Sequence, residues 1–123
     1  MKLPPKSVQV PSVSPSYNNT PLSPRIPGVT VSRVAVPDKV VALTFDDGPH
    51  GTLTPRVLDI LRDNNVKGTF FMQGCNVKAH PQVVRRMVSE GHEVGNHTWN
   101  HAYLSKVSRE KAESQLQSTN EAI

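Results

Sequence analysis

The stretch that decides the fold is VVALTFDDGP, residues 40–49. Its first six residues form a nearly continuous apolar run, as expected of a parallel strand that is covered on both faces. The run ends at two adjacent aspartates, Asp46 and Asp47, and a Gly-Pro pair that favours a turn follows them. The sequence therefore predicts a buried strand whose carboxyl end presents two carboxylates.

A helix is predicted directly after this strand. Thr54 is the expected N-cap and Pro55 the first helical residue, because proline is favoured at that position. An apolar stripe for the inner face of this helix is formed by Val57, Leu58, Ile60 and Leu61. The polar run at residues 63–65 ends the helix.

The same pattern is repeated twice further along the chain. Residues 69–72 read as a second strand, and Pro81 opens a helix that Gly91 ends. The residues expected on the inner face of that helix are Val83, Val84, Met87 and Val88. A third strand is expected at residues 93–95, and Ser108 is expected to cap a last helix with Glu110 in its first turn.

Strands that alternate with helices predict an α/β fold with a parallel sheet and about three strand-helix units. The pattern does not choose between an open sheet and part of a barrel. Residues 1–37 hold 8 of the 11 prolines and little that can be buried, so we expect a disordered Pro/Ser-rich linker there. The domain itself is expected to span residues 38–123.

Composition excludes several classes of function. The formal charge of +4 comes from the linker, because residues 38–123 hold 10 basic and 10 acidic residues. Without a clustered basic patch, nucleic acid is not an expected partner. No apolar run is long enough to span a membrane, and the N-terminus shows no apolar core of a signal peptide. Cys75 is the only cysteine, so no intrachain disulfide is expected.

The Asp46-Asp47 pair lies where α/β folds build their sites, at the carboxyl end of a strand. Two neighbouring carboxylates repel each other unless a cation or a proton lies between them, which favours a metal ion. An ordinary turn or helix cap is the alternative interpretation.

His97 and His101 follow the third predicted strand at a spacing of four residues. A helical turn or a tight loop with this spacing can bring two imidazoles to one side, although they can equally belong to a packed loop. Two histidines and one carboxylate leave open positions on a metal, which suits a catalytic zinc site, with cobalt, manganese or iron as alternatives. A magnesium-dependent phosphate site is disfavoured by the histidines and by the lack of a Gly-rich loop.

A metal in such a site activates water and polarises a carbonyl, which is the chemistry of amide or ester hydrolysis. One aspartate would remain free to act as a general base. Asp46 and Asp47 would then have different roles.

The motifs TFDDGP (residues 44–49) and HTWNH (residues 97–101), with GTFF and GHEVGN between them, resemble the polysaccharide deacetylases with a NodB homology domain, carbohydrate esterase family 4. The resemblance covers roughly residues 38–120. It implies a distorted, here partial, (β/α) barrel and the removal of acetyl groups from N-acetylated sugar polymers such as peptidoglycan or chitin. It also implies that Asp46 is the catalytic base, that Asp47, His97 and His101 bind the metal, and that Thr98 holds the His loop by hydrogen bonding.

The family carries further motifs downstream, namely an arginine that positions the catalytic aspartate and a late histidine that acts as general acid. We therefore expect this chain to be the N-terminal portion of the domain, with feeble turnover by itself. A catalytically inactive remnant that binds metal or carbohydrate is the alternative. The resemblance further implies work outside the cytoplasm, and it matches no ligand position to His50, His80 or His92, which are expected on the surface or in loops.

Overall fold

The structure is a computed structural model that describes residues 40–123. The predicted linker at residues 1–37 and the predicted domain start at residue 38 lie outside the described residues. Along the chain the elements are β1 (Thr44–Gly48), α1 (Leu53–Asp63), β2 (Thr69–Met72), α2 (Gly74–Ala79), α3 (Pro81–Ser89), β3 (Glu93–Asn96), the short 3-10 helix η1 (Leu104–Lys106) and α4 (Arg109–Ala122).

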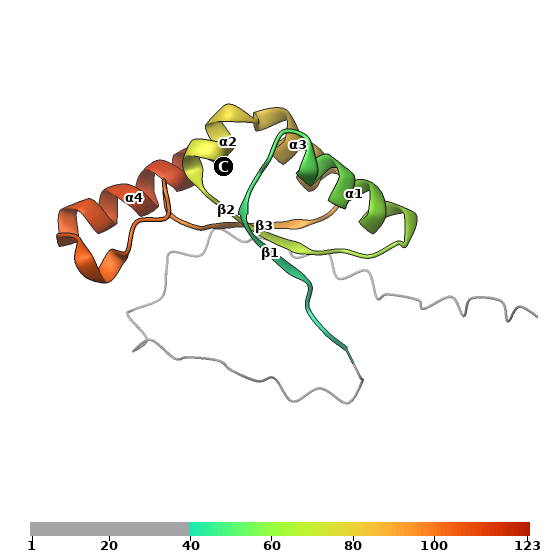
Figure 1. Cartoon of the computed structure of the whole chain (residues 1–123), viewed down its shortest axis with the longest axis horizontal. Coiled ribbons are helices and arrows are strands. Elements are labelled where there is room, and N and C mark those ends of the chain that lie inside the picture. The colour runs from blue at the N-terminus through green and yellow to red at the C-terminus, as the bar shows by residue number, and fades with distance from the viewer. Residues whose placement is uncertain (1–39) are drawn as a thin grey trace, which may run out of the picture. The chain divides into compact units, whose positions relative to one another are not determined.

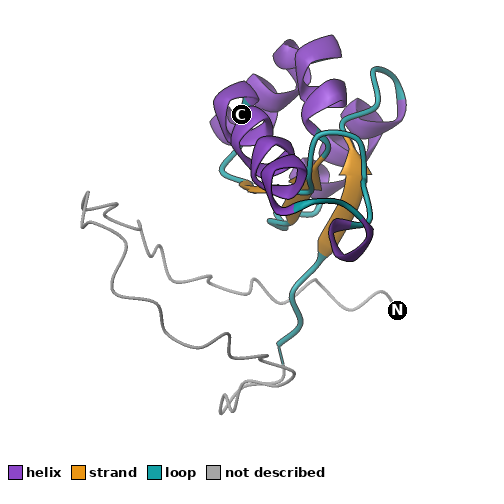
Figure 2. Cartoon of the chain, turned by 90° about the vertical axis from the view of Figure 1, so that its left-hand side faces the viewer, coloured by secondary structure: helices purple, strands orange, loops and turns teal. Residues whose placement is uncertain are grey.

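The three strands form one parallel sheet in the order β1-β2-β3. Figures 1 and 2 show the helices gathered on one side of this sheet. The predicted α/β class with three strand-helix units is confirmed. Because all strands run the same way, their carboxyl ends meet at one edge, where β1 ends at Gly48, β2 at Met72 and β3 at Asn96.

The core lies between the helices and the face of the sheet that they cover. Its buried members are Leu58, Leu61, Phe70, Met72, Val77, Val83, Val84 and Met87. Phe45 from β1 stacks on Phe70 from β2 with their ring centroids 4.8 Å apart. Phe71 alternates with the buried Phe70 along β2, so it lies on the other face of the sheet, where it is 36% exposed.

The first strand differs from its prediction. It begins at Thr44 rather than Val40, and Val40 and Val41 are 66% and 86% exposed. The link to β2 begins with the bond from Thr69 N to Leu43 O, so the residues before Leu43 have no partner strand among those described. The strand also continues through both aspartates, with an irregularity in its register between Asp46 and Gly48.

Helix α1 also begins earlier than predicted, at Leu53. Its N-cap is Thr52, and Thr54 is instead a buried residue whose Oγ1 accepts a hydrogen bond from His50 N at 2.9 Å. Ile60 is 62% exposed, contrary to prediction, because it lies two positions from Leu58 and so points about 200° away around the helix. Val88 of α3 is likewise 56% exposed and not part of the core.

Helix α2 was not predicted from the sequence. It has six residues, too few to show a helical period, and it begins directly after β2. The helix that opens at Pro81 and the helix capped by Ser108 are confirmed, and Ser108 Oγ accepts from Lys111 N. Among residues 40–123 no helix has the length and apolar character needed to cross a bilayer.

Candidate metal centre

Asp47 leaves the regular strand geometry at the carboxyl end of β1. Its φ is 69°, in the left-handed region, and the register with β2 shifts across it. Its carbonyl accepts a hydrogen bond from Asn76 Nδ2 and its carboxylate Oδ1 accepts one from Gln73 Nε2, each at 2.9 Å. Groups after β2 therefore hold both the backbone and the side chain of Asp47.

His97 and His101 lie on a tight loop that follows β3, here called the His loop (residues 97–101). His97 N donates to Met72 O at 2.9 Å, which places His97 at the carboxyl end of the sheet beside β2. Thr98 and His101 have φ values of 65° and 60°. These left-handed residues turn the chain sharply, so a loop rather than a helical turn brings the two imidazole rings to a centroid distance of 4.9 Å.

Polar side chains fix the His loop to helix α4. Asn96 Oδ1 accepts from Thr98 N at 2.8 Å, and Asn96 Nδ2 donates to Leu116 O at 2.8 Å. The buried Gln115 accepts two hydrogen bonds at Oε1, from Trp99 N at 2.9 Å and from Asn100 N at 3.1 Å. Helix α4 thus satisfies backbone donors that the turn leaves without partners in its own chain segment.

The start of helix α2 supports the same loop from another side. Gly74 N donates to Thr98 O and Cys75 N donates to Trp99 O, each at 3.0 Å. A Cβ at Gly74 would lie 2.4 Å from Trp99 Cε3, so this close approach requires glycine.

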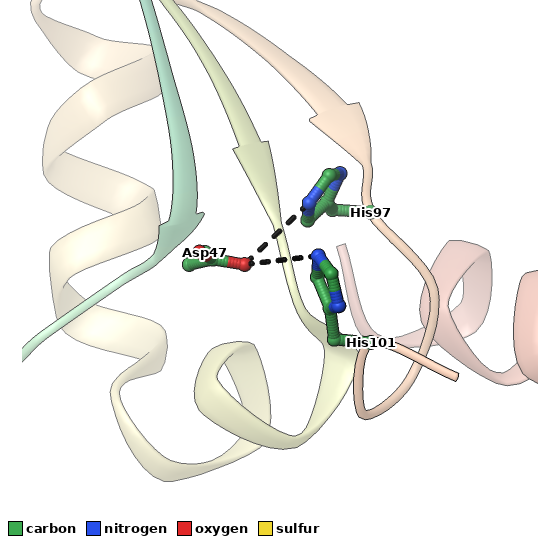
Figure 3. Close-up of side chains that lie close together, drawn as sticks. All are labelled: Asp47, His97 and His101. Atoms are coloured by element: carbon green, nitrogen blue, oxygen red, sulfur yellow. Dashed lines mark ion pairs between the residues drawn. The ribbon is translucent and has the colours of Figure 1, made fainter. Parts of the chain in front are cut away.

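Asp47, His97 and His101 converge into one cluster (Figure 3). Asp47 Oδ1 lies 3.5 Å from His97 Nε2 and 3.6 Å from His101 Nε2, and the three ligand atoms are all within 4.8 Å of one another. The side chains of Asp47 and His101 are about half exposed or more, at 62% and 52%, and that of His97 is 28% exposed. The cluster is therefore open to solvent on one side.

The two distances from Asp47 Oδ1 to the imidazole nitrogens fit a shared metal ion better than direct hydrogen bonds. Nitrogen and oxygen donors at about 2.0–2.1 Å from a tetrahedral zinc ion lie about 3.3 Å from each other. A strong hydrogen bond to a carboxylate is shorter, at about 2.7–2.9 Å. The donor set of two imidazoles and one carboxylate also matches catalytic zinc sites, in which a further position stays open.

A small hollow of about 150 Å³ borders the cluster and is lined by His97, Thr98, His101 and Ala102. A larger one, of about 420 Å³, lies between α2, Trp99 and α4. It contains none of the three candidate ligands. The candidate metal ligands His97 and His101 therefore line the smaller hollow and not the larger one.

Two other predicted site residues have less definite surroundings. Asp46 is exposed on β1 opposite Phe71, and among residues 40–123 no hydrogen bond or ion pair joins its carboxylate to the cluster. Thr98 takes part in the His loop through its backbone N–H and carbonyl, whereas its buried Oγ1 has no hydrogen-bond partner among the described residues. The roles of both side chains remain predictions.

The three other histidines do not join the cluster. His50 Nδ1 accepts from the backbone of Thr52 and Leu53 at the start of α1, and the ring of His80 lies against Gly51. His92 lies in the loop between α3 and β3, which agrees with the expectation of a surface or loop position, but it is buried, at 6% exposure. Its Nδ1 accepts from Gly68 N at 3.1 Å, and burial lowers its pKa below the ordinary value of 6.5.

Sequence reasoning missed the residues that support the ligands, namely Gln73, Asn76, Asn96 and Gln115. Gln73 and Asn96 stand at the carboxyl ends of β2 and β3, so the argument applied to the aspartates would have found them. Gln115 gave no such signal, because a glutamine within a polar helix resembles any solvent-facing residue.

Comparison with known proteins identifies relatives of this arrangement. Residues 33–123 match the sequence profile of the polysaccharide deacetylases. A peptidoglycan-N-acetylglucosamine deacetylase of Bacillus cereus is 51% identical over 79 residues, which are 64% of this chain and 37% of that protein. A chitooligosaccharide deacetylase of Sinorhizobium fredii is 48% identical over 94 residues, which are 76% of this chain and 44% of that protein.

A solved structure gives the same result for the fold. A family 4 acetyl xylan esterase from Clostridium thermocellum, in complex with a cobalt ion, is 44% identical with a TM-score of 0.63, over 66% of this chain and 40% of that one. The chain thus spans less than half the length of each of these three proteins. Since the family profile covers most of the sequence and the fold agrees, the chain belongs to the polysaccharide deacetylase family.

Proposed function

We propose that this chain carries the metal-binding part of a metal-dependent deacetylase that acts on N-acetylated sugar polymers of the peptidoglycan or chitin kind, and that residues 38–123 form the N-terminal portion of its domain. The observation that carries the proposal is the convergence of one carboxylate and two imidazoles at the carboxyl edge of the sheet. The family membership and the peptidoglycan and chitooligosaccharide deacetylases among the relatives support the substrate class.

Asp47, His97 and His101 would hold the divalent cation, most simply Zn²⁺, with Co²⁺ or Mn²⁺ as alternatives. The cobalt ion in the acetyl xylan esterase supports a divalent cation in this fold. When bound, the cation would lower the pKa of a coordinated water and polarise the acetyl carbonyl. The open side of the cluster leaves room for both.

Hydrolysis adds water across the amide C–N bond and yields acetate and a free amino group. Asp46 would accept the proton that the attacking water loses, a contribution of about a hundred- to ten-thousandfold in rate for a well-placed base. Its position next to Asp47 on β1 supports this role, because the register shift after Asp46 interrupts the regular alternation that would direct neighbouring side chains to opposite faces.

The experiment measures zinc binding and acetate release with the same protein. The chain, freed of metal with a chelator, should bind about one Zn²⁺ and release acetate from N-acetylglucosamine oligomers only feebly, but in a Zn²⁺-dependent way. Asp46→Asn should keep the zinc and lose acetate release. Zinc binding without any acetate release would favour the inactive remnant, and loss of zinc in Asp46→Asn would contradict the role of a base.

A further inference from the structure

Gln73 makes one contact that the proposed function does not use. Its amide group donates a hydrogen bond to Asp47 Oδ1 at 2.9 Å. An ionised carboxylate only accepts hydrogen bonds, so the amide nitrogen is the atom that faces Asp47. The oxygen contacted in this way is the same one that lies 3.5 and 3.6 Å from the two imidazoles.

The backbone of Gln73 is itself fixed. Its N–H donates to Gly48 O at 3.0 Å, and its carbonyl accepts from Asn76 N and Val77 N, each at 3.0 Å. Gln73 is also the N-cap residue of α2. A half-buried side chain that starts from this junction is therefore held close to the cluster.

The carboxylate of Asp47 would otherwise be free to rotate. It belongs to a left-handed residue, 62% of its side chain is exposed, and among residues 40–123 no other side-chain donor besides Gln73 and the two imidazoles lies against it. A carboxylate oxygen has lone pairs for two partners. Oδ1 can thus accept the amide of Gln73 and still offer a lone pair to a cation between the imidazoles.

Asn76 completes the arrangement from the next turn of the chain. Its Nδ2 donates to the carbonyl of Asp47 at 2.9 Å. One amide therefore holds the backbone of Asp47 and another holds its carboxylate. Of these two amides, only that of Gln73 contacts the carboxylate oxygen that faces the imidazoles.

We propose that Gln73 is a positioning residue for the metal site, which orients Asp47 Oδ1 toward the ion held with His97 and His101. This inference rests on the proposed function, since it requires the cluster to bind a metal. Groups that orient a metal ligand typically contribute about 10- to 100-fold in affinity.

The test compares Zn²⁺ affinity, by competition with a chromophoric chelator, in the full chain and in Gln73→Met, which keeps the length of the side chain and removes its donor. Affinity should fall by about 10- to 100-fold, while the unfolding midpoint of the metal-free chain stays unchanged. The absorption spectrum of bound Co²⁺ should change as well, which a purely structural role would not cause.

Gln117→Met is the matched control. Gln117 also donates to a carboxylate, that of Glu121 at 3.0 Å, but on the exposed face of α4. It should bind Zn²⁺ as the unchanged chain does. If Gln73→Met fails to fold, Gln73→Asn serves as the test in its place. It keeps the amide on a side chain one methylene shorter, so it should weaken Zn²⁺ binding in the same way.

An absent metal site and an absent positioning role would give different results. If Asp47→Ala binds Zn²⁺ as tightly as the unchanged chain, the metal site itself is wrong. If Asp47→Ala loses the metal but a folded Gln73 variant binds within twofold of the unchanged chain with the same Co²⁺ spectrum, the positioning role alone is overturned.

Discussion

At the scale of single residues, the three candidate ligands could be picked out because they lie at or just beyond the carboxyl ends of two predicted strands. Asp47 ends the first apolar run, and His97 follows the third strand at the same edge of the sheet. What the sequence does not show is the backbone geometry, since left-handed φ values at Asp47, Thr98 and His101 depend on contacts made elsewhere in the chain. The sequence therefore predicts which side chains gather at this edge, whereas the backbone geometry that positions them comes only from the structure.

The first residue-scale prediction concerns the imidazoles. His97→Ala and His101→Ala should each weaken Zn²⁺ binding by more than the roughly 10- to 100-fold expected for an outer contact, because each removes a ligand. Titration against a chelator measures this. His80→Ala, which removes a histidine outside the cluster, should leave the affinity unchanged, and an equal loss in all three variants would show that the effect is not local.

The second residue-scale prediction concerns pH and His92. Burial lowers its pKa, and Lys67 and Arg86 act in the same direction against the opposing Glu90. Below pH of about 6.5 the unfolded chain binds a proton that the folded chain does not, so the free energy of unfolding should fall as the pH falls from about 6.5. Above that pH this residue should contribute no pH dependence.

Urea unfolding between about pH 5 and 8 measures the effect. His92→Gln has no titrating ring but keeps an acceptor for Gly68 N, so its stability should depend less on pH in this range. If the variant and the unchanged chain show the same pH dependence, another group is responsible.

At the scale of elements, the apolar patterns predicted correctly which strands and long helices exist. They predicted less well the residues at which these elements begin and end. Strand β2 and the helices opened by Pro81 and Ser108 lie where the sequence indicated. Strand β1 is shifted toward the aspartates because the register with β2, not the apolar run, decides which residues pair. Helix α2 was not predicted because its six residues are too few to show a helical period, and only Gln73 separates it from β2.

Helix α4 holds the His loop through Gln115, a structural role that its polar sequence did not indicate. Gln115→Leu should leave the N–H groups of Trp99 and Asn100 without a partner and lower the free energy of unfolding by about 1–3 kcal/mol for each such group. Because the His loop is then less well held, Zn²⁺ binding should weaken. Gln115→Glu keeps an oxygen that accepts both bonds and should retain the metal. Chemical unfolding and zinc titration of both variants test this, and equal behaviour of Leu and Glu would contradict it.

At the scale of the whole molecule, the part that the structure describes, residues 40–123, has one layer of helices on one face of a three-stranded sheet. The core predicted from the helical stripes is largely right, with Ile60 and Val88 as the exceptions. Both residues were assigned to the inner faces of their helices, but more than half of each is exposed to solvent. The family resemblance supplied what the pattern left open, namely the choice between an open sheet and part of a barrel.

Core substitutions test this arrangement as a whole. Leu58 is fully buried and Ile60 is 62% exposed on the same helix. Leu58→Ala should lower the free energy of unfolding by about 2–5 kcal/mol. Ile60→Ala should change it by about 0.5 kcal/mol or less. Denaturant unfolding compares the two, and equal losses would show that α1 faces the sheet differently.

X-ray absorption spectroscopy of the zinc-loaded chain tests most directly whether Asp47, His97 and His101 share one ion. The expected first shell holds two imidazole nitrogens and oxygen donors at about 2.0–2.2 Å, with no sulfur. His97→Ala should remove one imidazole from that shell. A sulfur ligand at about 2.3 Å, which only Cys75 or a methionine can supply, or a shell unchanged by His97→Ala, would contradict the assignment.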